Sequence, residues 1–260
     1  MIDTPQRPAR KLPVETVLKR AFLYAWESRN LLLRPYLIFA ALLIATDLIA
    51  EVFAGPKNLI AAEILLVAQG LITTAFAVGI HRFVLLNETP KGVGFFHLDR
   101  YFVRYILISI ILGLLLLVAA APSVALQQTV GGGAPGGTAG IAALFALVFF
   151  VTSVLAVVRL SLLLPSAAVG DETPAKTIWQ TTYGNGFRLM ATGLLTAFPF
   201  FVAAVILSSA PDGELLRIAA IVVSGLIAPA EVIVLNTAQA LCYDLLVRGN
   251  GPAVAEPPRR

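Results

Sequence analysis

Long apolar runs alternate with short polar segments along the whole chain. A helix needs ~20 mostly apolar residues to cross the hydrocarbon layer of a membrane. Six runs meet this length: Pro35–Ala54, Leu59–Leu85, Tyr105–Ala121, Ile141–Leu164, Leu189–Ala210 and Ile218–Val247. The first follows a long polar segment, unlike the apolar region of a cleaved signal peptide. The pattern predicts an all-α integral membrane protein with six transmembrane helices.

Composition supports this fold class. Hydrophobic residues make up 58% of the chain and charged residues 13%, whereas a soluble domain is about 25% charged. So few charges leave too little polar surface to face water, and lipid must be the solvent for much of the molecule. The single cysteine, Cys242, excludes an intrachain disulfide.

The basic residues give the predicted orientation. Of 19 Lys and Arg residues, all but Lys57 and Arg217 fall on one side of the six predicted spans. Because Lys and Arg concentrate in cytoplasmic segments, both termini are expected in the cytoplasm. We therefore predict a multi-pass protein of the bacterial inner (plasma) membrane. This sorting also accounts for the pI of about 9.4 without a nucleic-acid partner.

The same pattern divides the chain into three parts. Residues 1–34 are expected to form a cytoplasmic segment with an amphipathic interfacial helix, residues 35–247 the six-helix transmembrane domain, and residues 248–260 a disordered cytoplasmic tail. Among the outer connections, residues 122–140 carry no charge and many glycines, which predicts a flexible loop. Residues 211–217 are expected to form a short turn.

One phrase occurs twice, each time before an apolar run. "NETPKGVGFFHLDRYFVR" (87–104) and "DETPAKTIWQTTYGNGFR" (171–188) share Glu-Thr-Pro and an Arg fourteen residues after the proline. Thr can cap a helix and Pro fits its first position. Residues after Pro174 are therefore expected to form a short amphipathic helix in the headgroup region. Gly92 and Gly94 interrupt the segment after Pro90, for which a loop is the alternative.

A third, weaker copy follows Pro13, with Val14, Val17, Leu18, Ala21 and Ala25 on one helical face. Two or three units, each an interfacial segment followed by two spans, would then build the domain. Their shared orientation differs from the inverted repeats of many transporters. Chance similarity within a biased composition is the alternative explanation.

Residues 159–190, "RLSLLLPSAAVGDETPAKTIWQTTYGNGFRLM", resemble a segment of bacterial multi-span inner-membrane proteins related to the glycerophosphoryl diester phosphodiesterase membrane domain family. The matching residues are Arg159, Ser161, Pro165, Trp179, Gly184, Asn185, Arg188 and Leu189. The resemblance implies an all-helical inner-membrane fold. It does not imply phosphodiesterase activity, because that activity belongs to a separate soluble domain for which this chain has no room.

Acidic residues inside the predicted spans are candidates for a functional site, because a buried charge is costly. Asp47, Glu63 and Glu231 are the three candidates, and Glu231 follows the helix-interrupting Pro229 by two residues. One interpretation is a cation or proton-coupled site. The alternative is that Asp47 and Glu63 are hydrated near the outer surface, while Glu231 is protonated or hydrogen-bonded to a neighbouring helix.

Basic and aromatic residues mark the cytoplasmic ends of the spans. We predict contacts with anionic headgroups or a partner at Arg34, Arg82, Arg104, Arg159, Arg188 and Trp179, with His81 beside them. Ordinary anchoring of the helix ends is the alternative.

No zinc-protease, nucleophile-elbow or phosphate-loop motif occurs in the sequence. We therefore expect a protein that is not an enzyme and needs no metal or cofactor. It would act through membrane lipids, a membrane protein partner or a second copy of itself, in envelope homeostasis. The alternative is a small-solute or proton-coupled carrier that uses the intramembrane acidic residues.

Overall fold

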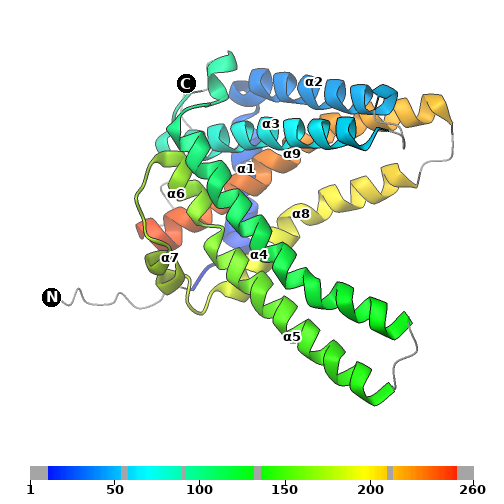
Figure 1. The fold of residues 1–260 in the computed structure, drawn as a ribbon. Helices are drawn as coiled ribbons and strands as arrows, with labels where there is room; N and C mark the ends of the chain where they lie inside the picture. The colour runs from blue at the N-terminus through cyan, green and yellow to red at the C-terminus, as the bar shows by residue number, and fades with distance from the viewer. Residues whose placement is uncertain (1–10, 54–57, 90–91, 132–135, 210–212, 251–260) are drawn as a thin grey trace.

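The structure, a computed structural model, describes residues 11–53, 58–89, 92–131, 136–209 and 213–250 of the 260-residue chain. The described residues are almost entirely helical and include no β-strand (Figure 1). The α-helices are α1 (Val14–Glu27), α2 (Arg29–Phe53), α3 (Leu59–Leu86), α4 (Arg100–Gly131), α5 (Gly136–Leu160), α6 (Leu163–Val169), α7 (Ala175–Thr181), α8 (Gly186–Ser208) and α9 (Glu214–Tyr243). A 3₁₀-helix, η1 (Gly92–Phe95), precedes α4, and a π-helix, η2 (Asp244–Arg248), extends α9.

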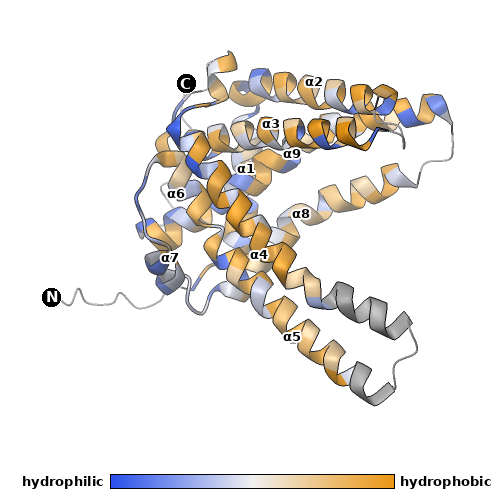
Figure 2. Ribbon diagram, viewed as in Figure 1, coloured by the Kyte–Doolittle hydropathy of each residue, from blue (hydrophilic) through white to orange (hydrophobic). Residues whose placement is uncertain are grey.

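Six helical stretches in the described residues are long and apolar enough to cross a membrane, which confirms the predicted fold class. They are Arg29–Phe53, Leu59–Leu86, Arg100–Pro122, Gly140–Val169, Gly186–Ser208 and Glu214–Arg248. At most 22% of the most apolar window of each is buried inside the protein. Many large apolar side chains are therefore exposed. Figure 2 shows that hydrophobic residues predominate along the long helices. The molecule is a multi-pass membrane protein whose outer surface suits lipid rather than water.

The helices pack tightly at one end of the molecule and diverge toward the other. We call the packed end the charged end; there α2, α4 and α8 begin, α3, α5 and α9 finish, and α6, α7 and η1 lie between them (Figure 1). The buried residues of α3 are all in its second half, and those of α8 in its first half. Toward the other end, the pair α4–α5 spreads away from α2 and α3 (Figure 1). The core therefore sits beneath the charged end.

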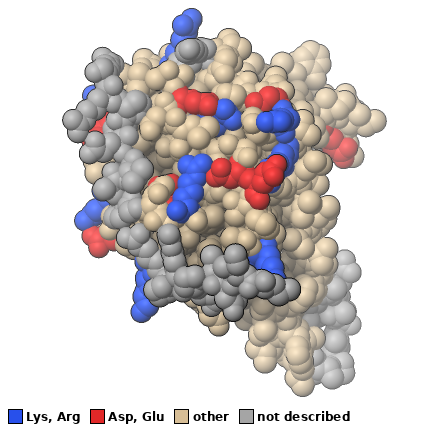
Figure 3. Space-filling model, turned by 90° about the vertical axis from the view of Figure 1, so that its left-hand side faces the viewer, with Lys and Arg blue, Asp and Glu red and all other residues tan. Residues whose placement is uncertain are grey.

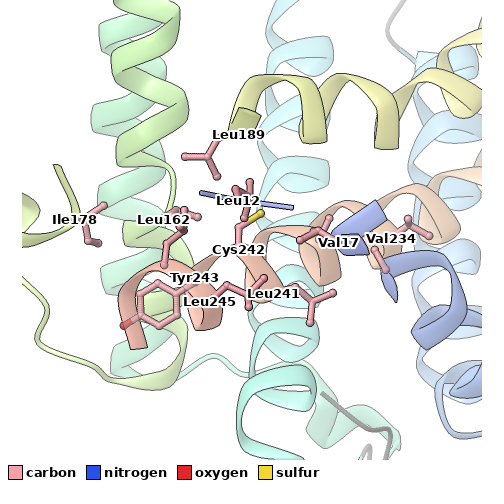
Figure 4. Close-up of a cluster of buried hydrophobic side chains, with 13 residues drawn as sticks. Leu12, Val17, Leu162, Ile178, Leu189, Val234, Leu241, Cys242, Tyr243 and Leu245 are labelled. Atoms are coloured by element: carbon pink, nitrogen blue, oxygen red, sulfur yellow. The ribbon is translucent and has the colours of Figure 1, made fainter. Parts of the chain in front are cut away.

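The chain before α2 belongs to this core. Leu12, Val17 and Ala21 are at most 1% exposed and pack with residues of α8 and α9 (Figure 4). The predicted apolar face of α1 is thus the face that packs. The predicted boundary between residues 34 and 35 falls inside α2, and the predicted disordered tail lies mostly outside the described residues.

The flexible loop predicted for residues 122–140 is wrong for most of its length. Helix α4 continues through Pro122 to Gly131, and α5 starts at Gly136. These helical extensions lie beyond the candidate spans, which finish at Pro122 and resume at Gly140. The predicted turn at 211–217 is wrong in its second part too, because α9 begins at Glu214.

The segments that follow the two Glu-Thr-Pro phrases differ in structure. Residues after Pro174 form the predicted short helix, α7, which ends before Gly184 with φ of 74°. The described residues after Pro90 form the short 3₁₀-helix η1 instead. The internal repeat and the position of α7 in the headgroup region stay predictions.

Candidate functional site

A pocket of about 490 Å³ lies where α2, α3, α4 and α9 meet. Its apolar walls come from α2, with Phe39 and Leu43, and from the α9 residues around Val232. Its polar lining residues are Thr73, Thr74, Tyr105, Ser109, Glu231 and Asn236. This volume is within the range that binds small molecules, about 300–1,000 Å³. The pocket combines an apolar wall with a few polar groups, as ligand sites do.

Helix α9 places Glu231 at the middle of its span, midway between Glu214 and Arg248. Pro229 lies inside α9 and cannot donate to the carbonyl one turn earlier. The Tyr36 hydroxyl of α2 donates to the Leu226 carbonyl in this weakened turn. Pro229 thus leaves the Gly225 carbonyl without its helical donor two residues before the carboxylate, and the Tyr36 bond to the neighbouring Leu226 carbonyl joins α2 to the same turn.

Glu231 is half-buried and has neither a hydrogen bond nor an ion pair within the described part of the chain. It is the one charged residue among those that line the pocket. A half-buried carboxylate without a partner is less stable than one fully in water. A bound proton, water in the pocket or a bound cation would each stabilise it. Of the two interpretations drawn from the sequence, the hydrogen bond from Glu231 to a neighbouring helix does not occur within the described residues, whereas a protonated carboxyl group and a cation site both fit this position.

A buried histidine lies behind this pocket. His81 of α3 is 0% exposed, and its Nε2 is 3.4 Å from the hydroxyl oxygen of Tyr105, a pocket residue. The side chains of Asn236 and Gln239 on α9 also approach the ring. His81 Nδ1 has no hydrogen-bond partner among the described residues. The expected headgroup contact at His81 is therefore wrong, because packing at the charged end removes it from the surface.

The other two acidic candidates lie outside the pocket. Asp47 accepts a hydrogen bond from Gln69 of α3, which also donates to Thr46 over 3.1 Å. Glu63 is exposed on α3. The structure thus does not bring Asp47 and Glu63 together with Glu231, and the local partners of Asp47 fit a structural role.

Three of the predicted headgroup-contact arginines bond inside the protein. Arg82 donates to Glu88 over 2.6 and 2.8 Å and to the Ala168 carbonyl of α6. The Arg159 guanidinium lies 3.7 Å from the centre of the Trp179 ring and donates to Thr182. Each therefore joins helices at the charged end.

The third, Arg188, fixes the N-terminal segment to α8. Its Nη1 donates to the Leu12 carbonyl over 3.0 Å, and Asn185 Oδ1 accepts from the Leu12 amide over 2.9 Å. Both polar groups of the buried Leu12 backbone are thereby satisfied. The Gly-Asn-Gly-Phe-Arg stretch singled out in the sequence has a structural use, as the attachment point of the segment before α1.

Arg34 and Arg104 differ from these three, since neither has an interaction partner among the described residues. Arg34 is exposed and Arg104 half-buried, and the exposed Trp179 lies at the same end. Lys, Arg, Asp and Glu side chains gather together on this face (Figure 3). Two of the five predicted arginines thus remain available for an outside contact.

Sequence reasoning found Glu231, and Asn236 after it on the same helix, but not the hydroxyl residues around them. Thr73, Thr74 and Ser109 are hydroxyl side chains inside apolar runs, and each is common in structural helix packing. Tyr105 begins a predicted span, and nothing in the sequence pattern around it predicts that it lines a pocket. The polar residues in apolar runs were a usable signal, whereas their meeting across four helices depends on the fold. No group of three or more His, Cys, Asp or Glu residues within the described ranges could hold a metal ion.

No family model, curated protein or solved structure matches this chain. The resemblance of residues 159–190 to a phosphodiesterase-associated membrane domain therefore stays a prediction. The fold and the site define a class: a multi-pass helical membrane protein with an open pocket between α2, α3, α4 and α9 that carries one carboxyl group.

Proposed function

We propose that this protein is a carrier of the bacterial inner membrane that binds a small organic cation at Glu231 in exchange for a proton. The observation that carries the proposal is the Glu231 carboxyl group, which lies in a pocket midway along the span Glu214–Arg248 and has no partner within the described residues. This was the alternative function drawn from the sequence. The pocket gives it more support than the contact function receives.

The lining of the pocket favours a cation. It contains one carboxyl group, several hydroxyl groups and an amide, and no Lys, Arg or His among the described residues. An anion placed there would meet a like charge or an uncompensated desolvation cost. An ammonium-type group would neutralise the carboxylate, while Phe39 and Leu43 cover its apolar part. Since proton and cation compete for one carboxylate, uptake of one releases the other.

The orientation belongs to the same proposal. The charged end would face the cytoplasm with both chain termini, because nearly all Lys and Arg residues of the sequence belong there. The pocket would then lie in the membrane interior, beneath the packed cytoplasmic ends of the helices.

Binding of tetraphenylphosphonium to the purified protein tests the proposal. This cation carries no titratable proton, so any proton released on binding comes from the protein. We expect saturable binding with proton release, and Glu231→Gln should weaken binding at least about tenfold, or about 1.4 kcal/mol. Glu63→Gln is the control, because it removes an exposed carboxylate outside the pocket. Equal binding by all three proteins would refute the cation site.

A second candidate function, contact with anionic lipid, is favoured by Arg34 and Arg104 at the charged end, which have no partner in the part of the chain that the structure describes. Cationic side chains at this depth attract anionic headgroups. Arg34→Gln combined with Arg104→Gln should lower the amount of co-purified phosphatidylglycerol and cardiolipin, measured by mass spectrometry. An unchanged lipid content would remove this candidate.

A further inference from the structure

His81 is the one described histidine that is completely buried, and the pocket chemistry proposed above does not use it. Its Nδ1 lacks a hydrogen-bond partner within the described residues, although the ring is 0% exposed. A histidine kept only for packing normally has both ring nitrogens satisfied, because an unpaired buried polar atom is costly. In the tautomer whose Nε2 accepts from the Tyr105 hydroxyl group, Nδ1 carries the ring proton and has no acceptor among the described residues, so Nε2 is the atom that can take a further proton.

Tyr105 connects this imidazole with the Glu231 pocket. Its hydroxyl oxygen is 3.4 Å from His81 Nε2, and the same residue lines the pocket together with Glu231. Asn236 is a second link, because it lines the pocket and approaches the ring. Toward the charged end the polar groups continue, since Gln239 approaches the ring and donates to the Ser161 carbonyl over 2.9 Å.

We infer that His81 is a second proton-binding site, which exchanges protons with the Glu231 pocket through the Tyr105 hydroxyl group. The inference rests on the proposed carrier function and adds a place for the proton that a bound cation displaces. The proton leaves the Glu231 carboxyl group for water in the pocket and reaches the Tyr105 oxygen. Tyr105 passes its own hydroxyl proton to His81 Nε2. A neutral carboxyl–imidazole pair thereby becomes a carboxylate–imidazolium pair, and the reverse steps restore it.

The groups around His81 leave Glu231 as its charged counterpart. The polar side chains found to interact with the ring within the described residues are Tyr105 from α4 and Asn236 and Gln239 from α9, all uncharged. Arg82, the next residue on α3, is turned to Glu88 and to the Ala168 carbonyl. A change of charge at Glu231 should therefore change the proton affinity of His81, because few other charged groups lie nearby to compensate it in the membrane interior.

Nitrogen NMR of the ¹⁵N-histidine-labelled protein tests the inference. The chain contains two histidines, so a His97→Gln background leaves His81 as the single imidazole signal. We expect both His81 nitrogens to respond to pH, with a proton affinity at least about threefold lower in Glu231→Gln. Glu63→Gln should leave the signal unchanged. Tyr105→Phe should shift the Nε2 resonance and slow proton exchange, while the protein stays folded because only a hydroxyl group is lost.

A His81 signal that does not change between pH 4 and 9, or that responds alike in wild type and Glu231→Gln, would overturn the inference. The two proposals fail separately. Loss of tetraphenylphosphonium binding in Glu231→Gln with an unaffected His81 signal would leave the carrier and remove the second proton site. A His81 signal coupled to Glu231 without any cation binding would do the reverse.

Discussion

Gly79 is the point where η1 touches α3. A Cβ atom at this position would lie 2.6 Å from the Phe95 carbonyl oxygen and 2.7 Å from its ring. Phe95 is 3% exposed and its ring packs on Phe76 at 5.5 Å. The absence of a side chain at Gly79 therefore allows η1 to lie directly on the helix that also carries His81.

Gly79→Ala should destabilise the protein by about 1–3 kcal/mol, since a backbone atom blocks the added methyl group. Gly70→Ala on the same helix is the control, because nothing lies within 4 Å of its Cβ position. That variant should be neutral or gain up to about 1 kcal/mol from helix propensity. Thermal unfolding in detergent compares the two. Equal melting temperatures would contradict the close approach.

At this scale the sequence predicted the type of residue better than its surroundings. Glu231 was identified because a carboxyl group inside an apolar run is unusual on its own. The sequence did not predict whether each arginine side chain contacts headgroups or bonds within the protein, because the bonding partners come from other helices. Arg82, Arg159 and Arg188 therefore matched the pattern of headgroup contacts yet bond within the protein.

Helix α1 is attached to the transmembrane helices through Leu12 as well as through its apolar face. The face of Val17 and Ala21 was readable from helical spacing, and the structure buries it. The polar attachment was not readable, because Asn185 lies more than 170 residues away in sequence. Helix-forming patterns are local, whereas docking depends on distant residues.

Asn185→Ala removes the acceptor of the Leu12 amide and should free this segment. The loss of a buried hydrogen bond costs about 1–3 kcal/mol, so amide exchange at Leu12 and in the first turn of α1 should be at least about tenfold faster. Asn58→Ala is the control, since it removes the cap of α3 through Ala61 and leaves α1 untouched. Exchange mass spectrometry makes the comparison. Unchanged protection of α1 in Asn185→Ala would show that the hydrogen bond between the Leu12 amide and Asn185 does not hold this segment in place.

For the whole molecule, six apolar runs were enough to predict six spans, because length and composition decide insertion into lipid. Their arrangement was not predictable. The divergence of α4–α5 from α2 and α3, and the pocket at the junction, arise from contacts concentrated at the charged end (Figure 1). The loop predicted for residues 122–140 was wrong because glycine content and lack of charge do not by themselves end a helix, and α4 and α5 both continue into this segment.

The central claim is that Glu231 faces a pocket that water can enter, and labelling of an introduced cysteine tests it most directly. The native Cys242 is buried and is replaced by alanine as the background. Ser109→Cys places a thiol in the pocket lining, and Leu107→Cys places one on the exposed outer surface of the same helix, α4. Maleimides react with the thiolate, which forms only in contact with water. We predict that a water-soluble maleimide labels Ser109→Cys in membranes, that tetraphenylphosphonium slows this labelling, and that Leu107→Cys stays unlabelled. If Ser109→Cys resists the reagent as Leu107→Cys does, the pocket is dry and the account of Glu231 is wrong.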